Sequence, residues 1–344
     1  MLLRSDNVAG VSPEIMAAIA AVAEGDMAPY GDDSLTRSLG ERFGALFGRP
    51  CAVVPVGTGI VANALALSLA AGPLDAAIAS TEAHAAVSEG GAFELFSGGA
   101  KLLTLASADA RLDPAALDDM LSHVDFARSA TMPPRIVSIT QATERGLVYR
   151  PAEVAAIAAV THRHGLKLHM DGARFANAVA ALGCTPAEAT AGVDVLCFGA
   201  TKNGAMSAEA LVVFDEALTH RLAQRIRRAG QSASKQRFMA AQLIAYLEDD
   251  LWLRNARRAN AAARQLAEGL CRLPGVTLAW PVQANLVFAT IAPEAQARLA
   301  AAGIRFRQRD AKRPEDNLFR LVPSFATGEA EIASLVAACA GALG

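Results

Sequence analysis

The sequence predicts an α/β protein with a large domain on a mostly parallel, seven-stranded sheet and a smaller C-terminal α/β domain. Two observations predict this class. Short apolar runs alternate with helical patterns through the first two thirds of the chain, which favours a parallel sheet wrapped by helices. The pattern then changes to a long helical stretch followed by short apolar runs that suit antiparallel strands. We place the boundary between residues 1–232 and 233–344 of the 344-residue chain.

The seven expected strands of the large domain are short apolar runs, with helical patterns such as Pro151–His164 between most of them. They are Cys51–Val56, Ala76–Ala79, Leu102–Leu105, Ile136–Thr140, Leu166–Met170, Val193–Phe198 and Ala210–Phe214. In the second domain we expect one long helix from about Ser234 to Gly269, then strands in "GVTLAW", "NLVFATI", "GIRFR" and "NLFRLV". Two further helices are expected over Pro293–Ala302 and Gly328–Leu343.

The composition argues against several functional classes. A net charge of −2 gives no electrostatic footprint for nucleic acid or an anionic membrane. The uncharged run from Pro50 to Leu74 is interrupted by Pro and Gly, so a buried strand and helix are favoured over a membrane span. The five cysteines show no CxxC spacing, so we expect neither disulfides nor a zinc site, and a cytoplasmic location. The histidines of "HRHGLKLH" lack further ligands, so no bound metal is expected.

Two residues that could carry chemistry follow neighbouring expected strands. Asp171 falls at the carboxyl end of an apolar run, where open α/β sheets bind ligands, although it could instead cap a helix. Lys202 follows the next run, in a loop of small residues. Partial desolvation there would free its amine as a nucleophile, although a solvent-facing lysine is the alternative.

A third element, Gly57-Thr58-Gly59, stands between an expected strand and helix, where backbone N–H groups can bind a phosphate. A glycine turn needed only for its geometry is the alternative. Together, the lysine, the aspartate and the phosphate site suggest pyridoxal phosphate (PLP). That cofactor needs a lysine Schiff base, an acid for its pyridine nitrogen and a phosphate site. Arg174 would then lie near the ring oxygen or a substrate carboxylate.

Further motifs follow one another along nearly the whole chain. They are "RSDN" at 4–7, "YGDD" at 30–33, "GTGIVAN" at 57–63, "EAHAAVSEGGA" at 82–92, "SITQATERG" at 138–146, "HMDGAR" at 169–174, "FGATKNGA" at 198–205 and "FRLVPS" at 319–324. In their order and spacing, the chain resembles the low-specificity L-threonine aldolases. These belong to the β-eliminating lyase group of fold-type-I PLP enzymes.

The resemblance implies a fold-type-I PLP enzyme that cleaves a β-hydroxy-α-amino acid such as L-threonine or L-allo-threonine to glycine and an aldehyde. It also implies a homodimer or homotetramer with active sites near subunit interfaces. Carried over by position, Lys202 would form the Schiff base, Asp171 would pair with the pyridine nitrogen, and His84 would stack on the ring. The other roles are phosphate binding by Gly57, Thr58 and Gly59; ring-oxygen or carboxylate binding by Arg174, Arg320 and Ser5; and an interface motif containing Tyr30 and Asp32.

The chain departs from the family pattern at two places. Ile60 stands where the family often has a hydroxyl residue, so one phosphate contact is in doubt. Asp125 stands where some relatives have a histidine, and His123 lies two residues earlier. The base for the substrate hydroxyl is therefore open among His84, His123, Asp125 and water.

Three alternative functions remain at this point. One is another fold-type-I PLP lyase or a hydroxymethyltransferase. A dinucleotide-binding dehydrogenase would need GxGxxG, which is absent, although Asp75 lies at a suitable distance for its acidic residue. A non-catalytic binding protein is the third. A yellow purified protein would favour PLP over the last two.

Overall fold

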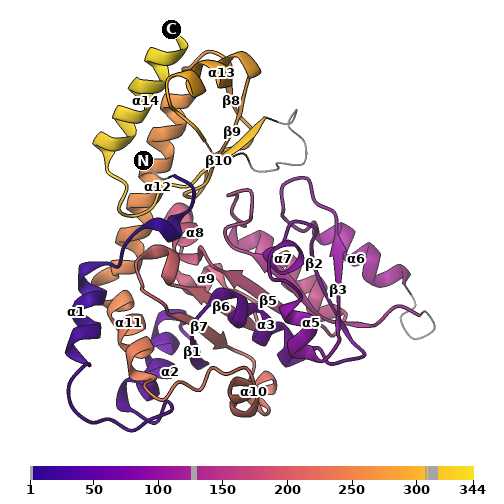
Figure 1. Cartoon of the computed structure of the whole chain (residues 1–344). Coiled ribbons are helices and arrows are strands. Elements are labelled where there is room, and N and C mark those ends of the chain that lie inside the picture. Colours follow the sequence, from indigo (N-terminus) through magenta and orange to yellow (C-terminus); the bar gives the residue numbers. More distant parts are fainter. Residues whose placement is uncertain (1–2, 125–129, 307, 309–316) are drawn as a thin grey trace.

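The computed structural model describes residues 3–124, 130–306, 308 and 317–344. Figure 1 shows a large part around one sheet and a smaller part that carries the C-terminus. The seven strands predicted for the large part are confirmed. They are β1 (Ala52–Val56), β2 (Ala76–Ser80), β3 (Lys101–Leu105), β4 (Pro134–Thr140), β5 (Lys167–Gly172), β6 (Val195–Gly199) and β7 (Glu209–Val213).

The strand order of this sheet is β1-β7-β6-β5-β4-β2-β3. Strands β3, β2, β4, β5 and β6 are parallel, whereas β7 is antiparallel to both β6 and β1. Strand β1 therefore runs in the same direction as β6, and six of the seven strands place their carboxyl ends at one edge. In the register, Asp171 of β5 lies between Thr140 of β4 and Cys197 of β6. The predicted fold class is confirmed.

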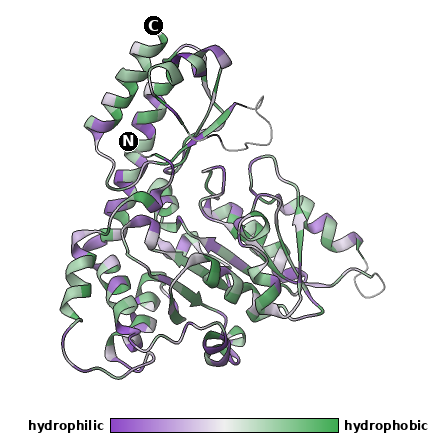
Figure 2. Ribbon diagram, in the orientation of Figure 1, coloured by the Kyte–Doolittle hydropathy of each residue, from purple (hydrophilic) through white to green (hydrophobic). Residues whose placement is uncertain are grey.

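Helices cover both faces of this sheet, and apolar residues follow its strands (Figures 1 and 2). One apolar core contains residues of the helices α1 (Pro13–Ala21), α2 (Ser34–Phe47), α6 (Pro114–His123), α7 (Pro151–Arg163), α8 (Phe175–Leu182) and α9 (Pro186–Ala189). A second core contains residues of α3 (Gly59–Ala70), α5 (Ala92–Ser97) and α10 (Leu222–Arg228). The short helix α4 (His84–Val87) follows β2, and the 3-10 turns are η1 (Asp6–Val8), η2 (Thr201–Asn203), η3 (Glu216–Thr219) and η4 (Glu248–Asp250).

A cluster of aromatic rings holds β6 against the helices. The Phe198 ring packs edge-on against Phe43, with centroids 5.2 Å apart. The Phe175 ring stacks on Trp252 with an interplanar angle of 3° and centroids 6.3 Å apart. Such pairs contribute about 0.5–1.5 kcal/mol each beyond burial. Because Phe198 lies in β6 and Phe175 opens α8 just after β5, the cluster fixes the two strands that precede Lys202 and Arg174.

The long helix predicted from about Ser234 to Gly269 is wrong in one respect, because two helices occupy this stretch. Helix α11 (Arg237–Leu247) and helix α12 (Leu251–Leu270) are separated at Asp249 and Asp250, which both adopt left-handed backbone angles. The break lets α11 pack on the large core while α12 continues into the small one. No proline or glycine marks this break in the sequence.

The smaller part contains an antiparallel sheet of order β10-β9-β8, as predicted. Its elements are β8 (Val276–Leu278), β9 (Val287–Ile291), α13 (Pro293–Ala301), β10 (Leu318–Leu321) and α14 (Glu329–Leu343). The strand predicted in "GIRFR" does not form over residues 303–306, and Arg307 lies outside the described residues. Ile304 and Phe306 pack against the small core instead of extending the sheet.

The two apolar cores divide later in the chain than residue 232. The large core extends through α11 to Ala256, whereas the small core begins at Ala262 and also includes Leu3 from the N-terminal segment. We therefore propose that the two units meet within α12.

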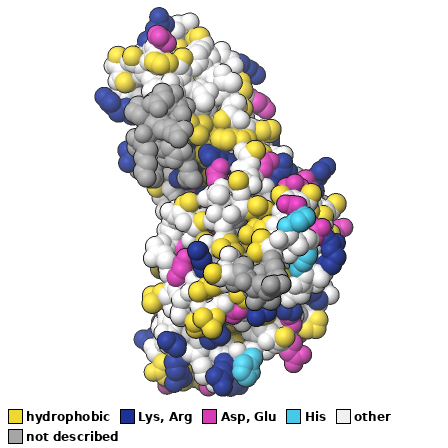
Figure 3. All heavy atoms as spheres, turned by 90° about the vertical axis from the view of Figure 1, so that its right-hand side faces the viewer, with side chains coloured by type: hydrophobic (Ala, Val, Ile, Leu, Met, Phe, Trp, Pro, Cys, Tyr) yellow, Lys and Arg dark blue, Asp and Glu magenta, His cyan; other side chains and the backbone are white. Residues whose placement is uncertain are grey.

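The helices and the surface charges bear on whether the protein contacts a membrane. Among the described helices, none combines the length and the apolar composition that a bilayer span requires. On the face shown in Figure 3, acidic and basic side chains are interspersed.

Gly172 offers a test of how tightly the end of β5 is packed. A Cβ atom there would lie 2.5 Å from the Cys197 carbonyl oxygen and 2.8 Å from Leu196 Cδ1. Because backbone cannot move aside cheaply, we expect Gly172→Ala to lower the free energy of unfolding by about 1–3 kcal/mol. Urea unfolding measures this, with Gly10→Ala as the control, since nothing lies within 4 Å of its Cβ position. Equal midpoints for the two variants would contradict the packing argument.

Candidate active site

A cavity of about 400 Å³ opens at the edge where the parallel strands end. Its wall brings together predicted residues from four separate segments of the chain. They are Gly57, Thr58, Gly59, His84, Asp171, Arg174 and Lys202. The wall also contains Ile60, the departure from the family pattern noted above. Its remaining residues were given no role by the sequence: Asn7, Asn63, Thr140, Ala142, Glu144, Ala173, Thr201 and Glu209.

Asp171 is buried at the carboxyl end of β5, with 6% of the residue exposed. Its Oδ1 accepts a hydrogen bond from the Ala173 amide at 2.9 Å, and its Oδ2 accepts one from Asn63 Nδ2 at 2.9 Å. Helix α8 begins at Phe175 with Arg174 as its N-cap, so Asp171 is not the helix cap. A buried carboxylate is costly without a positive partner, which fits a protonated ring nitrogen in the cavity.

Lys202 lies in the turn η2, directly after β6. Its neighbour Asn203 is buried and fixes this turn, because Asn203 Nδ2 donates to Tyr246 Oη at 2.6 Å and to the Trp252 carbonyl at 2.8 Å. Asn255 Nδ2 donates to the Asn203 carbonyl at 2.8 Å. Helices α11 and α12 therefore set the backbone from which the lysine reaches the cavity wall.

The turn Gly57-Thr58-Gly59 joins β1 to α3, as predicted. Thr58 caps α3, with its Oγ1 accepting from the Val61 amide at 3.3 Å. The N-terminus of this 12-residue helix presents amides without intrahelical partners, which suits an anionic group. Two residues far along the chain support the turn: Gln231 Oε1 accepts from the Gly57 amide at 3.0 Å, and Ser207 Oγ donates to the Gly57 carbonyl at 2.9 Å.

His84 opens α4 and contacts two buried carboxylates. Its Nδ1 lies 2.8 Å from Glu89 Oε1, and its backbone amide donates to Glu144 Oε1 at 2.9 Å. Asn63 Nδ2 donates to the same Glu89 oxygen at 2.8 Å. Glu89 stands in the "EAHAAVSEGGA" motif, five residues after His84. Its place in this motif is the signal in the sequence that marks it as a candidate functional residue.

Arg174 is held by an acid from the N-terminal segment. Its Nε and Nη2 donate to the two carboxylate oxygens of Asp6 at 2.8 and 3.0 Å. Asn285, from the smaller part, donates to Asp6 Oδ2 at 3.0 Å. Burial alone would raise the pKa of Asp6, but the charge and hydrogen bonds of Arg174 lower it overall. The pair therefore stays ionised. The Nε and Nη2 hydrogens of Arg174 that point at Asp6 are engaged in these hydrogen bonds and are not available to a ligand.

The other predicted residues lie outside the cavity wall. Arg320 of β10 donates to the Arg4 carbonyl at 3.3 Å, which places it beside Ser5. Tyr30 is 60% exposed, and the neighbouring Asp32 pairs with Arg37. His123 ends α6 on the surface and contacts Asp119, whereas Asp125 lies outside the described residues. Within the described chain, no group of three or more His, Cys, Asp or Glu side chains could hold a metal ion.

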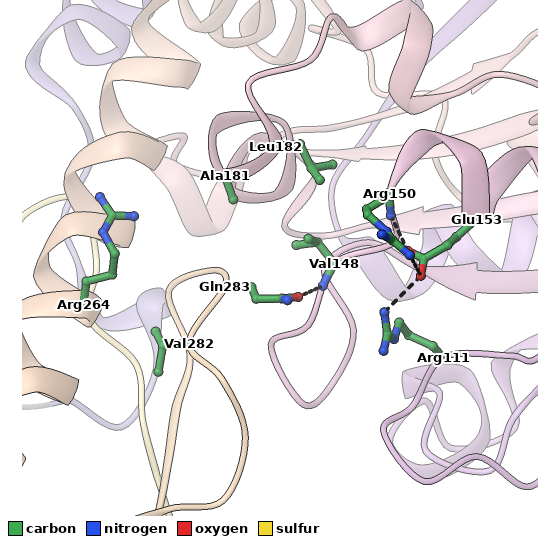
Figure 4. Close-up of a pocket in the computed structure, with 9 residues that line it drawn as sticks. All are labelled: Arg111, Val148, Arg150, Glu153, Ala181, Leu182, Arg264, Val282 and Gln283. Carbon is green, nitrogen blue, oxygen red and sulfur yellow. Dashed lines mark hydrogen bonds and ion pairs between the residues drawn. The ribbon is translucent and has the colours of Figure 1, made fainter. Parts of the chain in front are cut away.

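A second, more open cavity of about 550 Å³ lies between the two parts of the chain (Figure 4). Two of its three basic side chains, Arg111 and Arg150, pair with Glu153, at 3.4 and 3.0 Å. Gln283 Oε1 accepts from the Val148 amide at 2.8 Å and ties the smaller part to the larger one. Arg264 also lines this cavity, and the Gln283 contact makes it a junction between the two parts of the chain.

The chain is similar to known proteins over most of its length. The model of the family described as beta-eliminating lyase matches residues 3–293. A low specificity L-threonine aldolase from Pseudomonas aeruginosa is 46% identical over 305 residues, which cover 88% of this chain and 87% of that protein. The structure of a threonine aldolase from Leishmania major matches with a TM-score of 0.91 and 29% identity over 99% of both chains. A serine palmitoyltransferase structure with a PLP internal aldimine shares the fold, with a TM-score of 0.70 and 17% identity over 96% of this chain and 83% of that one.

Glu144 gives this site a pH dependence that can be measured. Burial, and then the negative charge of Asp171, raise its pKa from 4.5 to about 7. The folded protein therefore holds a proton that the unfolded chain has released, so stability falls as the pH rises from about 4.5 to about 7. The loss amounts to about 3 kcal/mol at neutral pH.

Glu144→Gln is expected to remove this loss, because the amide has no proton to release and its oxygen can still accept from the His84 amide. Urea unfolding of the cofactor-free protein between pH 5 and pH 8 measures the effect. The difference between variant and wild type should grow with pH in favour of the variant, and a constant difference would contradict the assignment.

Proposed function

We propose that this chain, which belongs to the beta-eliminating lyase family, cleaves L-threonine and related β-hydroxy-α-amino acids to glycine and an aldehyde. It is a PLP-dependent lyase of fold type I. The observation that carries the proposal is the convergence of Lys202, Asp171, His84 and the Gly57-Thr58-Gly59 turn on one cavity.

The residues of this cavity fit PLP. Asp171 is a buried carboxylate whose protein donors, Asn63 and Ala173, are uncharged, so a cationic ring nitrogen would supply the missing charge. The N-terminus of α3 would hold the phosphate, with Lys202 as the amine that binds the cofactor carbonyl carbon. When bound, PLP withdraws electrons from the substrate Cα and so weakens the bond between Cα and Cβ.

The carboxylate of the substrate would be bound by Arg320 together with Arg174 or Ser5. Arg320 and Ser5 are brought together by the contact of Arg320 with the Arg4 carbonyl. Fixing both the amine and the carboxylate leaves Cα little freedom, and such orientation lowers the barrier by several kcal/mol.

The base for the substrate hydroxyl would be His84. It lines the cavity and its Nδ1 is engaged by Glu89, which leaves Nε2 to accept a proton. The side chain of His123 is 77% exposed beside Asp119, which makes it the weaker candidate among the described residues.

We also propose that the protein is a cytoplasmic homodimer or homotetramer with active sites near its subunit interfaces. Exposed apolar side chains near the cavity support an interface there. Ile60, in the cavity wall, is 38% exposed, and Met206, beside Ser207, is 47% exposed.

The attachment of the cofactor gives a direct test of the function. Reduction of the yellow holoenzyme with sodium borohydride, followed by peptide mass mapping, should place a pyridoxyl group on Lys202. Lys167 is a useful internal control, because it pairs with Asp215 far from the cavity wall. An adduct on Lys167, or on any lysine other than Lys202, would overturn the assignment.

The substrate epimers test how the β-carbon is held. With His84 as the one imidazole that the described wall presents, the hydroxyl position is weakly enforced. We expect kcat/KM for L-threonine and L-allo-threonine to differ by less than about tenfold, or 1.4 kcal/mol. D-threonine should be cleaved far more slowly, because its Cα cannot satisfy the same contacts. A preference of about a hundredfold between the L-epimers would contradict this, as would efficient cleavage of D-threonine.

A further inference from the structure

A continuous chain of hydrogen bonds joins the ring-nitrogen acid to the imidazole of the cavity. Asn63 Nδ2 donates to Asp171 Oδ2 at 2.9 Å and to Glu89 Oε1 at 2.8 Å. The same Glu89 oxygen lies 2.8 Å from His84 Nδ1. One amide group of α3 therefore connects two carboxylates, and the second carboxylate contacts the imidazole.

The interior members of this chain are shielded from water. The Glu89 side chain is 1% exposed, and Asn63 is 3% exposed, whereas the His84 side chain is 44% exposed. Glu89 does not line the cavity, but His84 does. Glu89 therefore acts on the cavity through the two wall residues that it bonds, His84 and Asn63.

The hydrogen-bonding capacity of each group gives the tautomer of His84 that goes with an ionised Glu89. The two hydrogens of Asn63 Nδ2 serve the two carboxylates, one each. An ionised Glu89 can only accept, so the hydrogen bond to His84 requires a proton on Nδ1. The neutral imidazole then has no proton on Nε2, and this nitrogen is the acceptor available to the cavity.

Other charged groups around His84 do not act on Nδ1. Glu144 accepts from the backbone amide of His84 and from Thr140 Oγ1. Asp171 is bonded through Asn63, and Lys202 and Arg174 lie elsewhere in the cavity wall. Glu89 is thus the group that sets which ring nitrogen of His84 carries the proton.

We propose that Glu89 is a positioning residue for the hydroxyl proton transfer. It fixes the His84 proton on Nδ1, presents Nε2 to the substrate hydroxyl, and offsets the positive charge that the imidazole gains. The proton moves from the hydroxyl oxygen to Nε2, the oxygen electron pair forms the aldehyde double bond, and the Cα–Cβ pair remains on Cα. This role rests on the proposed function, since it takes His84 as the base.

Two variants of Glu89 distinguish the effect of its hydrogen-bond acceptor from the effect of its negative charge. In Glu89→Gln, the amide oxygen can still accept from both His84 and Asn63, but the negative charge is lost. In Glu89→Leu, both the acceptor and the charge are lost. Glu94→Gln is the matched control, because it removes a carboxylate with a buried oxygen atom from the neighbouring helix α5, outside the cavity wall.

The first readout is spectroscopic and independent of turnover. Nitrogen-15 NMR of histidine-labelled holoenzyme, with His84→Asn for assignment, reports which ring nitrogen is protonated. We expect the proton on Nδ1 in the wild type, in Glu89→Gln and in Glu94→Gln. In Glu89→Leu, we expect the proton to move largely to Nε2. A wild-type proton on Nε2 would overturn the proposal.

The second readout is the kinetics with L-threonine. General-base assistance contributes about 10²–10⁴-fold, so Glu89→Leu should lower kcat by at least about a hundredfold. Glu89→Gln should lower it by less, with KM nearly unchanged in both, and Glu94→Gln should match the wild type. Glu89→Gln with wild-type kcat would refute the role of the charge, including in the case that Glu89→Leu fails to fold.

The two readouts distinguish this inference from the proposed function. If the wild type cleaves no threonine, the proposed function fails and the proton-transfer role of Glu89 fails with it, while the NMR result still decides whether Glu89 sets the tautomer. If threonine is cleaved but Glu89→Leu turns over like Glu94→Gln, the positioning role alone is refuted.

Discussion

The burial of one carboxylate, Asp171, is the constraint on which the rest of the site depends. A buried carboxylate is costly, so it needs hydrogen-bond donors and a positively charged partner around it. The protein supplies the neutral donors Asn63 and Ala173, and in the proposed function the cofactor supplies the positive charge. The sheet puts Asp171 between Thr140 and Cys197 at the edge where the parallel strands end, which brings the other functional residues within reach.

The packing below the site explains why these residues keep their places. Phe198, in the strand before Lys202, lies among aromatic rings that include Phe43 and Trp252. Helix α12 contributes both Trp252 and Asn255, and Asn255 bonds the Asn203 carbonyl next to the lysine. The apolar core and the lysine turn are therefore held by the same helix, so a loss of core packing at α12 would also displace the amine.

The sequence predicted the seven strands well, because apolar runs are local features. The strand-end motifs are local too, and seven of the residues chosen from them line one cavity. Prediction from the sequence failed where the deciding interaction is distant in the chain. The break at Asp249 and Asp250 follows from α11 packing on the large core, and no local residue type marks it. Gln231 reaches Gly57 from 174 residues away, and Asp6 holds Arg174 across 168 residues. Asp125 lies outside the described residues, and the interface proposed for Tyr30 would require a second copy of the chain.

The contacts of Asp6 show how the smaller part takes part in the site. Asp6 belongs to the N-terminal segment, pairs with Arg174 of the large part and accepts from Asn285 of the small part. Nearby, the Arg145 guanidinium donates to Glu82 and stacks over the Trp280 ring of the small part at 4.6 Å. Glu82 lies two residues before His84, and Asn285 lies beside the strand β9 that pairs with Arg320. The position of the small part is thus coupled to Arg174, to Arg320 and to the segment that contains His84. In the proposed function, substrate contacts made by either part would therefore affect the other.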